Sequence, residues 1–185
     1  MRTVVRTTSL EMLSSTALIP SLGTPGDTRL ERAGIVSPEL SRYLYTAVGG
    51  DWHWRDRLPW TWARWMEWLA RPELETWVLA RQGTPAGYFE LEAQPGGSVE
   101  IAAFGLLPCF TGQGLGGYLL TRAVLRAWAM RPEVRRVWLH TCTLDHPAAL
   151  QNYRSRGFRV FEEVEEEIDL PDQPAGPWPG AERPR

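Results

Sequence analysis

The sequence contains no lysine, and its 20 arginines are balanced by 22 acidic residues to give a net charge of −2. A chain without a basic excess is not suited to hold nucleic acid through phosphate contacts. It also lacks any apolar run near the roughly 18 residues that suggest a membrane span. No continuous apolar stretch follows residues 1–6, so the N-terminus is not typical of a secretory signal. We therefore expect a cytoplasmic protein without a nucleic-acid or membrane partner.

Cysteine is equally scarce, and Cys109 and Cys142 stand at a spacing that matches no disulfide framework. This usage favours two free, buried thiols in a reducing cytosol. Cys142 lies close in the sequence to His140, Asp145 and His146, which are also metal-ligating residue types. Alternation places His140 and Cys142 on one face of a strand, whereas the other two fall in the following loop, and the spacing is not a zinc pattern. We therefore predict no metal site.

The periodicity of the apolar residues indicates one α/β domain. The 185 residues, 43% of them hydrophobic, suffice for a single buried core. Residues expected as strands are 4–12, 75–81, 86–92, 99–107, 134–141 and 158–168, and residues expected as helices are 38–48, 61–70, 114–130 and 147–155. Hairpins followed by alternating strands and helices predict a mixed, mostly antiparallel central sheet of six to seven strands, flanked by about four helices. We expect residues 1–168 to form the domain and the Pro- and Gly-rich residues 169–185 to be a disordered tail.

A glycine-rich loop follows the strand expected at 99–107 and leads directly into the longest expected helix. The unpaired N–H groups at a helix start favour a phosphate, and glycine lets it approach the backbone; the alternative is a tight structural turn. A Walker loop is excluded because the chain has no lysine. Gly112, Gly114 and Gly117 have the spacing of a dinucleotide fingerprint, but the strand before them belongs to an antiparallel hairpin. A nucleotide-binding oxidoreductase is therefore kept only as an alternative.

This loop resembles the CoA-binding signature of the GNAT superfamily of N-acetyltransferases, Arg/Gln-x-x-Gly-x-Gly/Ala after a strand and a proline. Gly114 and Gly116 match its two small positions, whereas Thr111 stands where the family has Arg or Gln. The resemblance implies a GNAT-like fold and an acetyl-CoA site in which Leu106 and Leu107 pair their backbone with the pantetheine arm. The residues that it places at the diphosphate are Thr111, Gly112, Gln113, Gly114, Leu115, Gly116 and Gly117.

A second segment resembles the later GNAT motif, in which Asn-x-x-Ala on a helix is followed by Tyr and then by Gly-Phe. Ala149, Tyr153, Gly157 and Phe158 match this motif, and His146 replaces the usual Asn. The resemblance implies that CoA lies in a V-shaped opening between the strand before the glycine loop and the strand after the longest helix. It also implies that Tyr153 contacts CoA and protonates the departing thiolate. The alternative for Tyr153 is packing between helix and sheet.

A general base is needed because an acceptor amine with a pKa near 10 is mostly protonated at neutral pH. A carboxylate can take that proton directly or through water. Glu100 lies on the strand that leads to the glycine loop, and its spacing to Thr111 resembles that of the catalytic Glu in the histone acetyltransferase branch of the family. We predict Glu100 as the base and Glu90 as the second choice, with Glu92 on the same strand face. The alternative for each is a solvated strand face.

Tryptophan is abundant, and six of the ten tryptophans fall between Trp52 and Trp68. The family forms part of its acceptor site in this region, which implies that Trp52, Trp54 and Trp60 shape a pocket for the acceptor or stack on a cation. Packing of an amphipathic helix is the alternative. His140 is a further candidate contact to the substrate.

These resemblances together predict direct transfer of an acetyl group from acetyl-CoA to a primary amine on a small molecule or a peptide. The alternative is a catalytically inactive GNAT-like module that holds acyl-CoA as a sensor or scaffold, because Thr111 departs from the signature. The sequence does not identify the acceptor or the preferred acyl chain, and it leaves a homodimer open.

Overall fold

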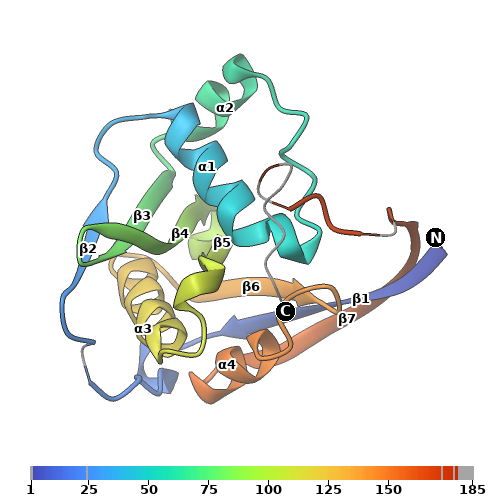
Figure 1. Ribbon diagram of the computed structural model, residues 1–185. Helices are drawn as coiled ribbons and strands as arrows, with labels where there is room; N and C mark the ends of the chain where they lie inside the picture. Colours follow the sequence, from blue (N-terminus) through green and yellow to red (C-terminus); the bar gives the residue numbers. More distant parts are fainter. Residues whose placement is uncertain (1, 24, 172, 177, 179–185) are drawn as a thin grey trace.

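A computed structural model describes residues 2–23, 25–171, 173–176 and 178 of the chain. The strands are β1 (Arg2–Met12), β2 (Thr28–Arg32), β3 (Leu74–Arg81), β4 (Thr84–Gln94), β5 (Ser98–Leu106), β6 (Arg136–Cys142) and β7 (Arg159–Asp169). The α-helices are α1 (Pro38–Gly49), α2 (Trp62–Leu69), α3 (Leu115–Trp128) and α4 (Ala149–Ser155). All seven strands form one mixed sheet, so the fold class expected from the sequence is confirmed (Figure 1).

The sheet has the strand order β2-β3-β4-β5-β6-β1-β7. Neighbouring strands are antiparallel except β5 and β6, which are parallel. The first strand, β1, lies between β6 and the last strand, β7, and the pair extends away from the rest of the sheet (Figure 1). The acidic strand β7 is therefore an edge, and all of its residues are exposed or half-buried.

Two layers of helices cover the sheet. α3 and α4 pack on one face, where the fully buried Leu119 and Val124 meet Phe89 and Leu139 in the main core. α1 covers the other face, where Leu44 packs against residues of β4 and β5, and α2 lies beside α1 (Figure 1). The expected helix at 114–130 is α3, which begins and ends within two residues of those limits.

Two helix starts follow directly from the sequence. Ser37 caps α1 by accepting a hydrogen bond from the backbone N–H of Leu40 at 3.2 Å, and Pro38 occupies the first turn, where its missing N–H has no consequence. Thr61 caps α2 in the same way through the N–H of Arg64. Strand β2 was not expected from the sequence, because it is short and polar. It lies at the edge of the sheet and pairs only with β3.

The C-terminal segment 169–185 was expected to be a disordered tail, and this stays a prediction. Residues 172, 177 and 179–185 lie outside the described residues. Within the described part, Leu170 is 7% exposed, and the N–H of Gly176 donates to the carbonyl of Gly50 at 3.1 Å. None of the described helices is both long and apolar enough to cross a membrane.

Candidate active site

The sheet opens between β5 and β6. These parallel strands pair at only three positions, of which Glu100 opposite Trp138 is the last. Beyond it β5 continues for six residues to Leu106 and β6 for four residues to Cys142 without further pairing to each other. The backbone edges that face each other across this gap are free of ladder partners, so the V-shaped opening expected from the sequence exists.

A cavity of about 610 Å³ occupies this opening. Its walls come from β5, β6, α4, the glycine loop and the loop after α1. The predicted site residues that line it are Trp52, Trp54, Glu100, Leu106, Thr111, Gly112, Gly116, His140 and Tyr153. Those that do not line it are Trp60, Glu90, Leu107, Gln113, Gly114, Leu115 and Gly117. Segments distant in sequence therefore meet around one space.

The glycine loop presents the start of α3 without a side-chain cap. Gly114 is the N-cap residue, its φ of 77° lies in the left-handed region, and no side chain bonds to the first turn. A Cβ at Gly112 or Gly114 would have no neighbour within 4 Å, so the space beside the loop is open. The unpaired N–H groups of a first turn suit an anion, and this arrangement fits the diphosphate of CoA.

The side chains of Thr111 and Gln113 bond to carbonyl groups of the loop itself. Thr111, which replaces the Arg or Gln of the signature, donates its hydroxyl to the carbonyl of Pro108 at 2.7 Å. Gln113 donates to the carbonyl of Cys109 at 2.8 Å. The N–H of Leu107 donates to Ala86 on β4 and so points away from the opening. Binding of a diphosphate here would therefore rely on backbone groups.

A β-bulge interrupts β5 at the cavity. Leu91 of β4 lies opposite Ile101, whereas its neighbour Glu90 lies opposite Ala103, so Ala102 is the extra residue. Such a residue has no ladder partner, and the bulge turns the strand. Ala102 lines the cavity, so the bulge lies at the opening between β5 and β6.

Tyr153 on α4 lies against the opening and is only 6% exposed. Its ring contacts those of Phe104 and Phe158, with centroids 6.0 and 6.4 Å away. Burial, aided by the negative charge of Asp145, raises the pKa of Tyr153 well above its ordinary value. The hydroxyl therefore stays protonated at physiological pH and is available as a donor.

Glu100 and His140 meet at the inner end of the opening. The Nδ1 of His140 lies 3.6 Å from the Oε1 of Glu100, whose side chain is 12% exposed. The carboxylate raises the pKa of His140 above its usual value, the charges of Asp145 and Asp56 act in the same direction, and burial opposes them. Both groups line the cavity, so a carboxylate and an ionisable imidazole face the same space.

Glu90, the second candidate base, does not line the cavity and is bound in a buried ion pair with Arg57. It is 1% exposed, and its Oε2 accepts hydrogen bonds from Arg57 and from the indole of Trp68. The guanidinium of Arg57 lies over the rings of Tyr45, Trp60, Trp65 and Trp68 at 4.6–5.9 Å. Trp60 thus belongs to an aromatic cage around an internal cation.

Trp52 and Trp54 line the cavity and connect the loop after α1 to the loop after β6. The indole N–H of Trp54 donates to Asp145 at 3.2 Å, and the ring of Trp52 meets that of His146 with centroids 5.1 Å apart. Gly49 permits this placement, because a Cβ there would lie 2.2 Å from the ring of Trp54. These contacts hold two walls of the cavity together.

Among the lining residues that were not predicted as site residues from the sequence are His53, Arg57 and Asp145. His53 adopts a left-handed backbone conformation with φ 59°, which is uncommon for residues other than glycine and is often found at functional sites. Asp145 accepts from the hydroxyl of Thr141 at 2.7 Å and so closes the turn after β6. An aspartate in the turn after a strand is common, and only the fold brings this one to the cavity.

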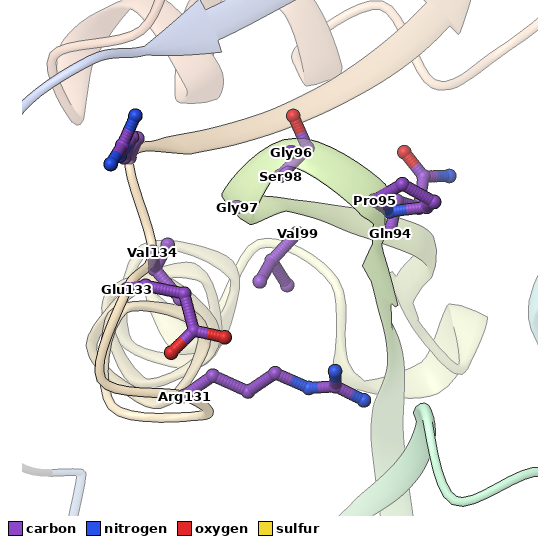
Figure 2. A pocket seen from close by; sticks show the side chains of 10 residues that line it. Gln94, Pro95, Gly96, Gly97, Ser98, Val99, Arg131, Glu133 and Val134 are labelled. Atoms are coloured by element: carbon purple, nitrogen blue, oxygen red, sulfur yellow. The ribbon is translucent and has the colours of Figure 1, made fainter.

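A second hollow, of about 360 Å³, lies between the turn of β4 and β5 and the loop between α3 and β6. Figure 2 shows the side chains of Arg131 and Glu133 on one side of it and the turn at Pro95 on the other. It contains none of the predicted site residues. Among the residues that the structure describes, no group of His, Cys, Asp and Glu side chains could hold a metal ion.

Comparison with solved structures places this fold among acetyltransferases. A GCN5-related N-acetyltransferase from Kribbella flavida is 20% identical with a TM-score of 0.64, and the match covers 90% of this chain and 59% of that one. A GCN5-related N-acetyltransferase from Sphaerobacter thermophilus is 19% identical with a TM-score of 0.64, covering 94% and 55%. The chain thus spans less than two thirds of the length of these two proteins.

A shorter neighbour is an aminoglycoside acetyltransferase from an uncultured soil metagenomic sample, which is 16% identical with a TM-score of 0.56 over 71% of this chain and 88% of that one. These likenesses show the fold. No curated protein matches the sequence significantly. The sequence model of the acetyltransferase (GNAT) family matches residues 39–158, which include both motifs and the opening between β5 and β6. The chain therefore belongs to the GNAT family of acetyltransferases.

Proposed function

We propose that the protein is an N-acetyltransferase that moves an acetyl group from acetyl-CoA directly to a primary amine. The observation that carries this proposal is the separation of β5 and β6 beyond Glu100, which joins the glycine loop, Glu100 and Tyr153 to one cavity. Members of the GNAT family generally use acetyl-CoA. We infer a cytoplasmic enzyme that acts on a small molecule or a peptide, without a metal.

The acetyl-CoA would bind in the opening with its diphosphate at the start of α3. The uncapped first turn and the open space beside Gly112 and Gly114 support this placement. The pantetheine arm would follow the free edge of β5 towards Leu106, and the thioester would lie beside the bulge at Ala102. Acetyl-CoA supplies the acetyl group as an activated thioester.

Deprotonation of the amine is assigned to Glu100. Its carboxylate lies at the inner end of the opening, next to His140, where the acceptor would meet the thioester. The amine nitrogen attacks the thioester carbonyl, a C–N bond forms, the C–S bond breaks, and the ammonium proton passes to Glu100 directly or through water. The buried hydroxyl of Tyr153 donates a proton to the departing thiolate, which leaves as CoA thiol.

The acceptor would enter between the loop after α1 and the inner face of β6. Trp52 and Trp54 form its aromatic wall, and His140 and Asp56 add polar groups. Trp60 and Glu90 do not line this space, so we assign the acceptor wall to the two loop tryptophans.

Thr111 supports a second candidate function, an acyl-CoA-binding module without turnover. Its hydroxyl is bonded within the loop, so no long donor side chain from this position reaches the diphosphate. Such a module would bind acetyl-CoA but release no CoA thiol when an amine is added.

Thermal unfolding with different ligands tests the binding half of the proposal. The purified protein is melted with acetyl-CoA, CoA, NADH and ATP at equal concentration. Acetyl-CoA and CoA are expected to raise the melting temperature, because a ligand that binds only the native state stabilises it by mass action. A shift with NADH alone would favour an oxidoreductase, and no shift with acetyl-CoA or CoA would contradict the site.

A further inference from the structure

Gln94 is the last residue of β4, and its side chain lies beside the proposed base. The Nε2 of Gln94 donates to the Oε2 of Glu100 at 2.8 Å. Its Oε1 accepts from the indole N–H of Trp138 at 3.0 Å. Trp138 in turn is the strand partner of Glu100 on β6, so three residues from three strands form one hydrogen-bonded chain.

The indole of Trp138 fixes which way the amide of Gln94 points. An indole N–H can only donate, so it requires the amide oxygen. The amide NH₂ therefore points to Glu100, and because it can only donate, it needs an acceptor there. A carboxylate oxygen is such an acceptor. The arrangement therefore holds the Oε2 of Glu100 at the amide of Gln94.

We propose that Gln94, oriented by Trp138, is a positioning residue that holds the Oε2 of Glu100 so that its Oε1 faces His140 and the acceptor amine. This inference rests on the proposed function, because it gives Glu100 the role of base. Gln94 does not line the cavity and so acts only through Glu100.

Other charged groups around Glu100 make this donor important. On β4, the Oε2 of Glu92 lies 3.5 Å from the same amide nitrogen, so one NH₂ group separates two carboxylates. Arg71 partly neutralises Glu92 through a contact of 2.6 Å. On β6, His140 faces the other oxygen of Glu100, and the charges of Asp56 and Asp145 act on that imidazole. Without the amide, the two glutamates would repel each other with less compensation.

The split between kcat and KM separates this role from a structural one. In Gln94→Leu the amide donor to Glu100 is lost, so kcat should fall by about tenfold, whereas the KM for acetyl-CoA should stay within about twofold of the wild-type value. Gln151→Leu is the matched control, because this exposed glutamine on α4 donates to Ser155 and should leave both constants in place.

Trp138→Phe is the second variant and keeps the inference testable if Gln94→Leu does not fold. It keeps an aromatic ring but loses the indole N–H, which frees the amide of Gln94 to turn, so kcat should fall in the same way by a smaller amount. A matching change in the KM for acetyl-CoA, or an unchanged kcat in both folded variants, would overturn the inference while leaving the enzyme assignment intact. A wild-type protein that binds acetyl-CoA but transfers nothing would overturn the proposed function and this inference with it.

Discussion

Removal of one hydroxyl group, in Tyr153→Phe, tests the assignment of the proton donor. The ring would keep its contacts with Phe104 and Phe158, and the residue is 6% exposed, so the core should be unchanged. Loss of a general acid typically costs about 10²- to 10⁴-fold in rate, and a thiolate leaves more readily than an amine or alkoxide. We therefore expect kcat to fall by about 100-fold, at the lower end of that range.

The assay measures kcat by release of CoA thiol, and acetyl-CoA binding by thermal shift, for wild type and variant. Binding should be the same in both, because the hydroxyl acts on the leaving group. Since burial raises the pKa of Tyr153, the wild type should show no loss of this donor up to about pH 9. Tyr43→Phe, an exposed tyrosine on α1, is the control. A loss of less than threefold in Tyr153→Phe would refute the reasoning.

Two further predictions concern charged groups around the cavity. Arg57→Met should lower the melting temperature by about 10 °C, because it leaves the buried carboxylate of Glu90 without its ionic partner. Arg64→Met removes an exposed ion pair and is the control. Equal shifts in the two variants would contradict a stabilising role of the buried ion pair. His140→Asn should destabilise the protein more at pH about 5.5 than at pH about 9. Glu100 raises the pKa of His140 in the folded protein, so the protonated imidazole stabilises the fold. This stabilisation is complete below the pKa of histidine in the unfolded chain and is lost as the pH rises through the pKa of His140 in the folded protein. Melting curves at both pH values check this, and a difference independent of pH would speak against it.

The parts of the site that could be predicted from the sequence are those encoded by local chain. The strand, glycine loop and helix around Gly114 are adjacent in sequence, and their backbone requirements restrict the residue types. The starts of α1 and α2 could be placed within one residue for the same reason, because a helix start depends on the next few residues. The opening between β5 and β6 was expected from the resemblance to the GNAT family and not from the local sequence.

Contacts between segments that are distant in sequence could not be predicted from local sequence patterns. The sequence shows a tryptophan-rich segment, but not that Arg57 lies within it as an internal cation bound to Glu90 of β4. The hydrogen bond from Trp138 to Gln94 depends on the register of the parallel pair β5–β6, which no local pattern specifies. Strand β2 was not predicted because a five-residue polar edge strand has no periodic pattern of apolar residues.

Acceptor-dependent release of CoA thiol from acetyl-CoA tests the central claim most directly. Wild type and Glu100→Gln are assayed side by side against a panel of diamines, amino acids, aminoglycosides and peptides, and the acetylated product is identified by mass spectrometry. We predict release with at least one amine and a loss of about 100-fold in Glu100→Gln at neutral pH. Binding of acetyl-CoA without release for any amine would support a non-catalytic module, and turnover that is unchanged in Glu100→Gln would contradict the proposed base.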